Sequence, residues 1–273
     1  MTEHFHITSI GHAHVKAGKL CQDHSSSYSD GVRTVITACD GHGGEVYIRS
    51  HKGSAFASLA MLRTVLELPS LSFRRFSAEE LEHNLKLHIL CEWNRLVATD
   101  LKRHPLRKSE VAHLRETEIE SLRRNPTRAY GTTLGGAMLC GSRLICVGIG
   151  DGGCYLLRNG EILPALPDGE DEPVANVTYS MCGEDAFEHM HARIVDVRGL
   201  DGVLLCTDGV LSPYQSTENF KKSFVRPVVR RILDGKVSEV KDFVCELGLH
   251  HGVGDDVSLA MLLTDRARFN AYK

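Results

Sequence analysis

Four short segments of the chain place an aspartate at one end of an apolar run. Asp40, Asp151 and Asp208 follow such runs directly or after one residue, and each precedes a glycine, whereas Asp255 and its neighbour precede a run that begins at Val257. Short apolar runs bounded by turn residues predict buried strands. If these strand ends meet, several carboxylates share a small space, and their repulsion is costly unless cations lie between them. The pattern therefore predicts a multi-metal site, and such sites usually serve phosphate chemistry.

The composition is that of a soluble globular protein, with 42% hydrophobic and 25% charged residues in 273. A formal net charge of -3 argues against a general nucleic-acid binder. Nine cysteines without a CxxC pair argue against a disulfide framework and favour reduced thiols. The first residues lack a signal-peptide pattern and no stretch has the apolar length of a membrane span. We therefore expect a cytoplasmic protein that binds neither nucleic acid nor membrane.

Three helical patterns lie between the first two aspartate motifs. Ala55, Leu59, Leu62 and Leu66 form one apolar stripe that Pro69 ends. Residues 77–80 have the form of a capping box and predict a second helix, which Pro105 closes. Its expected inner face comprises Leu81, Leu85, Ile89 and Leu96, with Trp93 beside them. A third, mostly charged stretch near 108–124 is expected to be peripheral.

The rest of the chain alternates short apolar runs with turn residues. Residues 131–163 predict a β meander with a tight hairpin turn at 158–161, and residues 164–176 predict a surface loop. Further strands are expected at 192–197, 203–206 and 257–264, and helices at 219–233 and 236–247. Hairpin-linked strands interrupted by helix pairs predict an α+β fold of antiparallel sheets covered by helices. We expect one domain, 1–273, with a helical excursion at about 76–126.

The segment DGHGG at residues 40–44 is the most specific motif. Three glycines around a histidine let the backbone approach a ligand or direct a carbonyl to a cation. Taken alone, the motifs at Asp151 and Asp208 could each be simple turns.

Six motifs together, in order, resemble the protein phosphatase 2C family, the metal-dependent serine/threonine phosphatases. They are Gln22-Asp23, DGHGG at 40–44, Gly131-Thr132-Thr133, Gly150-Asp151-Gly152, Thr207-Asp208-Gly209 and Gly254-Asp255-Asp256. The resemblance runs from Gln22 to Ser258 and is closest to the compact bacterial members. It implies a four-layer sandwich, in which two antiparallel β-sheets are flanked by pairs of helices, and a single phosphatase catalytic domain.

The resemblance also implies roles for individual residues. Asp40 would bridge two Mn²⁺ or Mg²⁺ ions, and the Gly41 carbonyl would bind one of them. Asp208 and Asp255 would complete the shell of the first ion, and Asp23 would position the second through water. Asp151, with Asp208, would hold a third, weaker ion. Hard cations prefer such oxygen ligands, and a water that bridges two of them can attack phosphorus in line.

The family likeness makes His42 the general acid that protonates the departing serine or threonine oxygen, a role that suits an imidazole. The alternative is that His42 is one of many ordinary histidines, since the chain has fifteen. The implied partners are a phosphorylated protein substrate and its opposing kinase.

The sequence departs from the family pattern at three places. Gly18 stands where members usually have an arginine that binds the substrate phosphate; Lys19 is one residue away, and Lys16 or His14 could also reach the phosphate. A lysine would bind phosphate as a point charge, without the fork of arginine. Gly152-Gly153 replaces the usual residues after Asp151.

The third departure is the pair Asp255 and Asp256, which replaces the usual Asp-Asn. Because neighbouring residues at a strand start face opposite sides, we do not expect both to bind one ion equally, and the alignment favours Asp255.

Several interpretations remain open. Gly131-Thr132-Thr133 is expected to be structural, with hydroxyls that support the site. The basic residues between Lys221 and Arg231 are either a docking face or the solvated side of a helix. A pseudophosphatase, which keeps the fold only to bind phosphoprotein, is the main alternative function. A metal-dependent phosphodiesterase or nuclease shares the metal chemistry but requires a basic groove.

Overall fold

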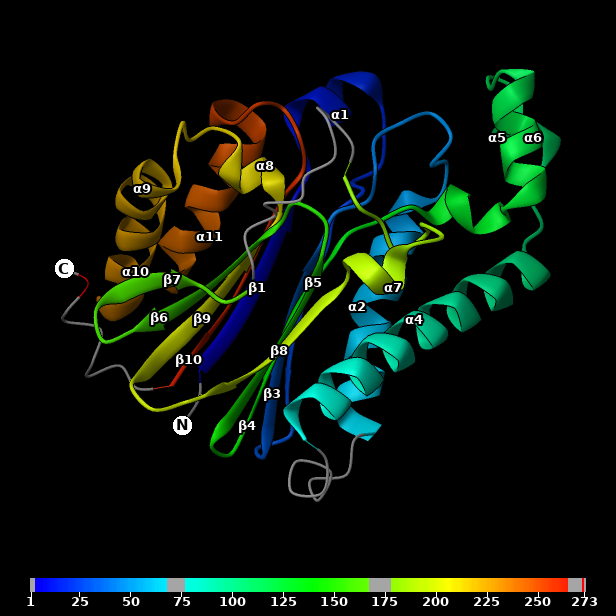
Figure 1. Ribbon diagram of the computed structural model, residues 1–273. Coiled ribbons are helices and arrows are strands. Elements are labelled where there is room, and N and C mark those ends of the chain that lie inside the picture. Colours follow the sequence, from blue (N-terminus) through cyan, green and yellow to red (C-terminus); the bar gives the residue numbers. More distant parts are fainter. Residues whose placement is uncertain (1–2, 68–76, 167–177, 265–271, 273) are drawn as a thin grey trace.

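The computed structural model describes residues 3–67, 77–166, 178–264 and 272, and it contains two five-stranded antiparallel sheets (Figure 1). The first sheet has the order β1 (Glu3–Ser9), β10 (Val257–Leu263), β9 (Leu200–Cys206), β6 (Gly153–Arg158) and β7 (Glu161–Pro164). The second has the order β2 (His24–Ser29), β3 (Arg33–Cys39), β4 (Leu134–Cys140), β5 (Arg143–Ile149) and β8 (His191–Asp196).

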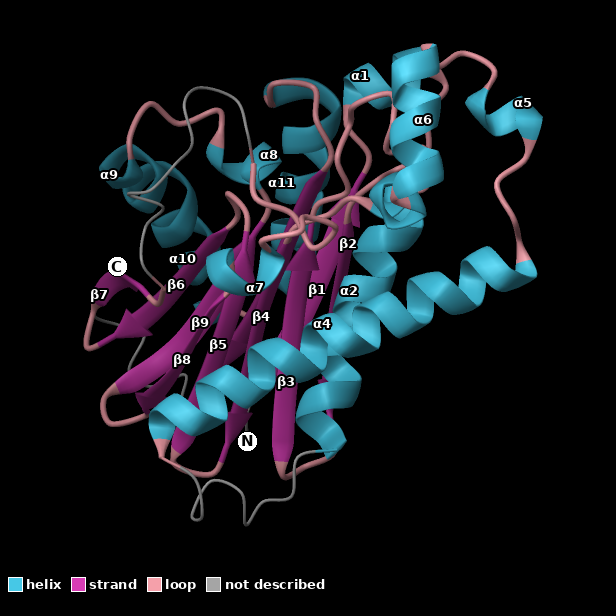
Figure 2. Cartoon of the chain, turned by 45° about the vertical axis from the view of Figure 1, so that its right-hand side comes forward, coloured by secondary structure: helices cyan, strands magenta, loops and turns pink. Residues whose placement is uncertain are grey.

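Helices cover the outer face of each sheet. The first sheet is covered by α9 (Thr217–Phe220), α10 (Arg226–Leu233) and α11 (Val237–Glu246), and a π-helical turn at Lys221–Val225 joins the first two. Helices α2 (Ser50–Glu67) and α4 (Ala78–Arg103) cover the second sheet, as Figure 2 shows. A separate apolar cluster, which includes Ile36, Leu144 and Leu205, lies between the sheets. This arrangement confirms the predicted four-layer α+β sandwich.

Two local sequence patterns, a hairpin turn and a helix cap, form the structures that they predict. Asn159 (φ 50°) and Gly160 (φ 86°) form the left-handed pair that a two-residue hairpin turn between β6 and β7 requires. Ser77 caps α4: its hydroxyl accepts the Glu80 N–H at 3.1 Å, and the Glu80 carboxylate accepts the Ser77 N–H at 2.9 Å. The predicted capping box is therefore confirmed.

The buried face of α2 differs from the predicted stripe. Ala55, Leu59, Leu62 and Leu66 are only partly buried, and Pro69 lies outside the described residues. The buried positions are mainly small or hydroxylated: Ser50, Gly53, Ser54, Ala57, Ser58, Ala60, Met61, Thr64 and Val65. Close packing explains this choice, since a Cβ at Gly53 would lie 1.9 Å from the Tyr130 carbonyl oxygen.

The third predicted helix is divided into two short ones. These are α5 (Lys108–Val111) and α6 (Glu116–Arg124), which we call the arm, and they lead into a 3₁₀ turn at Pro126–Tyr130. Figures 1 and 2 place the arm beyond the end of α4, at the end of the molecule where α1 (His12–Ala17) and α8 (Asp208–Leu211) lie. Most of the predicted loop at 164–176 lies outside the described residues. None of the helices in the described ranges is both long and apolar enough to cross a membrane.

Candidate metal centre

Sheet topology brings the aspartate motifs to one end of the sandwich. Strands β3 and β5 both pair antiparallel with β4, so they run in the same direction and end at the same edge. Strands β9 and β10 pair antiparallel, so the end of β9 meets the start of β10. One carboxylate oxygen from each of Asp40, Asp151 and Asp208 lies within 4.8 Å of the other two. The structure therefore brings together three of the predicted ligands.

The electrostatics of this cluster suit cations. Burial raises the pKa of Asp40 well above its usual range, and the nearby Asp23 and Asp208 add to the rise. Burial, followed by repulsion from Asp151, raises the pKa of Asp208 to about 6. The Oδ1 atom of Asp208 is buried without a hydrogen-bond partner among the described residues. Divalent ions that prefer oxygen ligands would relieve this repulsion and use the unpaired atom, so the residues present fit a metal site.

Asp23 lies behind the cluster. It is 7% exposed, and its Oδ2 atom accepts a 2.7 Å hydrogen bond from the Thr207 hydroxyl, whose oxygen in turn accepts the Ser258 N–H at 2.9 Å. Burial raises the pKa of Asp23 to about 8. Thr207 thus orients Asp23 next to Asp208, and an ion-positioning role for Asp23 stays a prediction.

The two adjacent aspartates before β10 have different surroundings. Asp256 is 2% exposed, and its two oxygens accept the backbone N–H groups of Gly11 at 2.7 Å and Gln22 at 2.6 Å. The side chain of Asp255 is 47% exposed, and its charge contributes to the raised pKa values of Asp40 and Asp208. Asp256 therefore has a structural role, which favours Asp255 as the ligand.

The Gly131-Thr132-Thr133 segment supports the backbone of Asp40. The Thr133 hydroxyl accepts the Asp40 N–H at 3.0 Å, while the Thr132 hydroxyl and the Thr133 N–H donate to the Asp40 carbonyl at 2.7 and 2.8 Å. Gly41 forms an isolated bridge with Thr132, and a Cβ at Gly41 would lie 2.5 Å from the Gln22 carbonyl oxygen. The expected supporting role of these hydroxyls is confirmed.

His42 lies in a largely buried position beside the cluster. Its backbone N–H donates to the Gly131 carbonyl at 3.1 Å. Its ring packs edge-on against the Tyr47 ring at a centroid distance of 4.8 Å. The Nε2 atom is buried and has no hydrogen-bond partner among the described residues. Burial lowers the pKa of His42, and the charge of Asp151 acts in the opposite direction. An unpaired ring nitrogen is suited to exchange a proton with a ligand.

The two residues predicted to bind phosphate lie on and after α1. The Nδ1 atom of His14 lies 2.9 Å from Asp256 Oδ1, and its Nε2 atom lies 3.9 Å from Asp255 Oδ1. Gly18 ends α1 in the left-handed conformation (φ 64°), which explains why glycine occupies this position. Lys19 is exposed, and its backbone N–H donates to the His14 carbonyl at 2.9 Å. The phosphate-binding roles of Lys19 and His14 stay predictions.

Sequence reasoning missed the partner of Asp151. Asp151 is exposed, and its Oδ2 atom accepts a 2.6 Å hydrogen bond from the Thr178 hydroxyl. No local pattern indicates a contact between residues so far apart in the chain.

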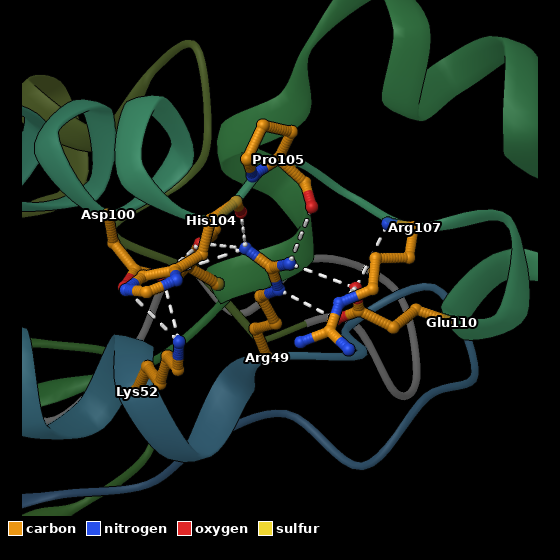
Figure 3. Close-up of polar contacts among 8 residues, drawn as sticks. Arg49, Lys52, Asp100, His104, Pro105, Arg107 and Glu110 are labelled. Carbon is orange, nitrogen blue, oxygen red and sulfur yellow. Dashed lines mark hydrogen bonds and ion pairs between the residues drawn. The ribbon is translucent and has the colours of Figure 1, made fainter.

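Sequence reasoning also missed Arg49, a buried arginine that follows the DGHGG motif in the chain (Figure 3). Arg49 is 4% exposed, and it makes a bidentate ion pair with Glu110 on α5 at 2.9 and 3.0 Å. It also donates to the His104 carbonyl and to the Tyr130 hydroxyl, both at 2.7 Å, and the Tyr130 hydroxyl donates to Asp100 at 2.6 Å. Arg49 thus joins the start of α2 to the end of α4, the arm and the segment before Gly131.

Comparison with solved structures gives the same fold over nearly the whole chain. A bacterial serine phosphatase is 16% identical with a TM-score of 0.62, over 97% of this chain and 98% of that one. Stp1 from Staphylococcus aureus is 17% identical with a TM-score of 0.61, over 97% and 96% of the two chains. The catalytic domain of PstP, solved with 2 manganese ions, is 19% identical with a TM-score of 0.57, over 96% and 97%. These likenesses establish the fold.

Comparison with the curated protein sequences gives no significant match. The family model for protein phosphatase 2C, however, matches residues 10–244, which include the motifs from Asp23 to Asp208. The chain therefore belongs to the protein phosphatase 2C family.

Proposed function

We propose that this protein is a metal-dependent protein serine/threonine phosphatase. The observation that carries the proposal is the meeting of Asp40, Asp151 and Asp208 within 4.8 Å at the end of the sandwich, in a chain of this family. Burial and the neighbouring carboxylates raise the pKa values of Asp40 and Asp208, which is the condition under which bound cations stabilise such a cluster.

Asp40, Asp208, Asp255 and the Gly41 carbonyl would hold two Mn²⁺ or Mg²⁺ ions, with Asp23 behind them. Asp151 would contribute, with Asp208, to a third site. When bound, such ions supply an acidified water for attack on phosphorus and positive charge opposite the phosphoryl oxygens. PstP, which has the same fold, was solved with manganese.

His42 would donate the proton that the departing serine or threonine oxygen requires. Its buried Nε2 atom has no partner among the described residues, and Tyr47 and Gly131 hold the ring and backbone in place. Asp151 lies near enough to favour the protonated ring, against the effect of burial. Lys19 and His14 are our candidates for contact with the substrate phosphate. The partners would be a phosphorylated protein and the kinase that opposes this enzyme.

The test is phosphate release from p-nitrophenyl phosphate and from a phosphothreonine peptide in the presence of Mn²⁺. We expect turnover that chelation abolishes and that Asp208→Ala lowers by at least about a thousandfold. Asp242→Ala, which removes an exposed carboxylate from α11, should keep wild-type activity.

Two results would contradict the proposal. Tight binding of the phosphopeptide without turnover would indicate a pseudophosphatase. Faster hydrolysis of bis(p-nitrophenyl) phosphate than of the monoester would indicate a phosphodiesterase.

A further inference from the structure

A large groove lies beside the candidate metal centre. Its volume is about 1090 Å³, slightly above the roughly 300–1,000 Å³ typical of ligand pockets. One wall is formed by α6 and the turn that follows it, and the opposite wall by residues 178–185. The groove is large enough for a segment of polypeptide.

Two side chains connect the groove to the catalytic residues. Tyr47 lines the groove, and its ring packs against the ring of His42. Thr178 also lines the groove, and its hydroxyl donates to Asp151. A substrate whose phosphorylated residue reached the aspartates could therefore place its neighbouring residues in the groove.

Both walls are joined to the segment that supports Asp40. On one side, Arg49 holds the arm through Glu110, as Figure 3 shows, and Arg128 donates to the Ser121 hydroxyl of α6 at 2.9 Å. On the other side, the Met181 N–H donates to the Thr132 carbonyl at 2.9 Å. The groove is thus held in place relative to the site, which lowers the entropic cost of binding.

The charges that line the groove are mainly negative. Four carboxylates line it, Glu116 and Glu120 from α6 and Glu184 and Asp185 from the opposite wall, against two guanidinium groups, Arg124 and Arg128. Arg124 pairs with Glu120 at 3.3 Å, and Glu116 pairs at 3.0 Å with Arg123, which points from outside the lining. Asp185 lies 3.2 Å from the ring Nε2 atom of His189, whereas Glu184 is exposed and has no ion-pair partner in the described part of the chain. The excess of carboxylates complements a basic ligand.

We propose that this groove binds the polypeptide segment next to the phosphorylated residue and prefers segments rich in lysine or arginine. The inference rests on the proposed phosphatase function and names the kind of substrate that this site selects. Because the arm supplies Glu116 and Glu120, the preference depends on the segment between α4 and β4.

The test compares two phosphothreonine peptides that differ only in their flanking residues, arginine in one and alanine in the other. We expect the wild-type kcat/KM to be about three- to tenfold higher for the basic peptide, as expected for exposed charge pairs. Glu184→Lys combined with Glu116→Gln should abolish that preference and leave p-nitrophenyl phosphate hydrolysis unchanged. Glu188→Lys, an exposed carboxylate of α7 (Ala186–His189) outside the groove lining, should keep it.

Equal kcat/KM for the two peptides in the wild type would overturn the inference, as would an equal loss on both peptides in the double variant. If p-nitrophenyl phosphate is not hydrolysed at all, the proposed function fails and the groove is tested by binding. Fluorescence anisotropy of the labelled peptides must then show tighter binding of the basic one, lost in the double variant; equal binding would reject the groove.

Discussion

The two helical layers pack against their sheets with different kinds of side chain. Helices α9 to α11 and their connecting turn bury large apolar groups, among them Phe220, Phe224, Val228, Ile232 and Val244. Helix α2 packs instead through small and hydroxylated residues such as Gly53, Ser54, Ala57 and Ser58. The first layer gains stability mainly from apolar burial. Helix α2 also forms hydrogen bonds with its sheet, since the Ser58 hydroxyl lies 2.8 Å from the Ser26 hydroxyl and 2.7 Å from the Thr37 hydroxyl.

The hydrogen bonds of α2 lead to the candidate site. The Ser54 hydroxyl donates to the Gln22 carbonyl at 2.6 Å, and the Gln22 side chain donates to the Ser50 hydroxyl at 2.7 Å and to the His42 carbonyl at 3.3 Å. The Gln22 N–H binds Asp256. Helix α2 is therefore hydrogen-bonded to residues of the candidate metal centre, whereas the α9–α11 layer contributes mainly apolar packing.

Substitution of Arg49 should have the largest effect. Arg49→Met removes the bonds to Glu110, His104 and Tyr130 and leaves the partly buried Glu110 carboxylate without its partner, so we expect the free energy of unfolding to fall by about 3 to 5 kcal/mol. Because the arm and the segment before Gly131 shift together, kcat should also fall at least about tenfold.

Urea unfolding and steady-state kinetics would measure both effects of Arg49→Met. Arg63→Met on the same helix is the control, since Arg63 is 43% exposed and pairs with Glu92 at the surface. A wild-type kcat in folded Arg49→Met protein would refute the positioning role of α2.

Ile232→Ala in α10 tests the other layer. Ile232 is 2% exposed in the apolar cluster, and its truncation should lower the free energy of unfolding by about 2 to 5 kcal/mol. At a temperature where the variant is folded, kcat and KM should equal those of the wild type. A clear fall in kcat, measured alongside circular dichroism that shows native structure, would break the division between the layers.

Thr133→Val tests the support of Asp40 with almost no change in volume. The substitution leaves the Asp40 N–H without its acceptor, so we expect a loss of about 1 to 3 kcal/mol in stability together with weaker activation by Mn²⁺. Thr99→Val in α4 removes a hydroxyl that bonds to the Arg95 carbonyl and should leave metal activation unchanged. Identical Mn²⁺ titrations for both variants and the wild type would argue against the supporting role.

The smallest expected effect is the pH dependence of the metal-free protein. The folded-state pKa values of Asp23 (about 8) and Asp208 (about 6) are raised above those of an unfolded chain. The folded protein therefore binds more protons than the unfolded chain above pH about 4, and its stability falls as pH rises towards about 8.

Thermal melts in EDTA should show Tm decreasing across this range. Mn²⁺ should remove the decrease, and Asp23→Asn should reduce it. A Tm in EDTA that stays constant or rises across this range would show that burial and charge repulsion do not raise the pKa values of these carboxyl groups in the folded protein.

Much of the fold could be predicted from local patterns. The capping box at Ser77 and the turn at Asn159-Gly160 act through neighbouring residues, so the sequence was sufficient to locate them. The stripe of α2 was misjudged because hydropathy favours leucine, whereas the close approach to Tyr130 requires glycine and small residues. The division of the third helix into α5 and α6 was also missed. The chain leaves the helical path between them and buries Leu114 in the core, a tertiary contact that the local pattern does not show.

The sequence by itself determined which carboxylates stand at strand ends, because each apolar run and its glycine turn are local. Only the tertiary structure decided which of them meet and what each one does. Antiparallel pairing brings Asp40, Asp151 and Asp208 together, and the N–H groups of Gly11 and Gln22 separate the role of Asp256 from that of Asp255. Arg49 likewise depends on a partner 61 residues away in the chain, Glu110, and one groove wall depends on the hydrogen bond from Met181 to Thr132. Hydrogen bonds and ion pairs form only between atoms that are close in space. Residues that lie far apart in the chain become close only when the chain folds.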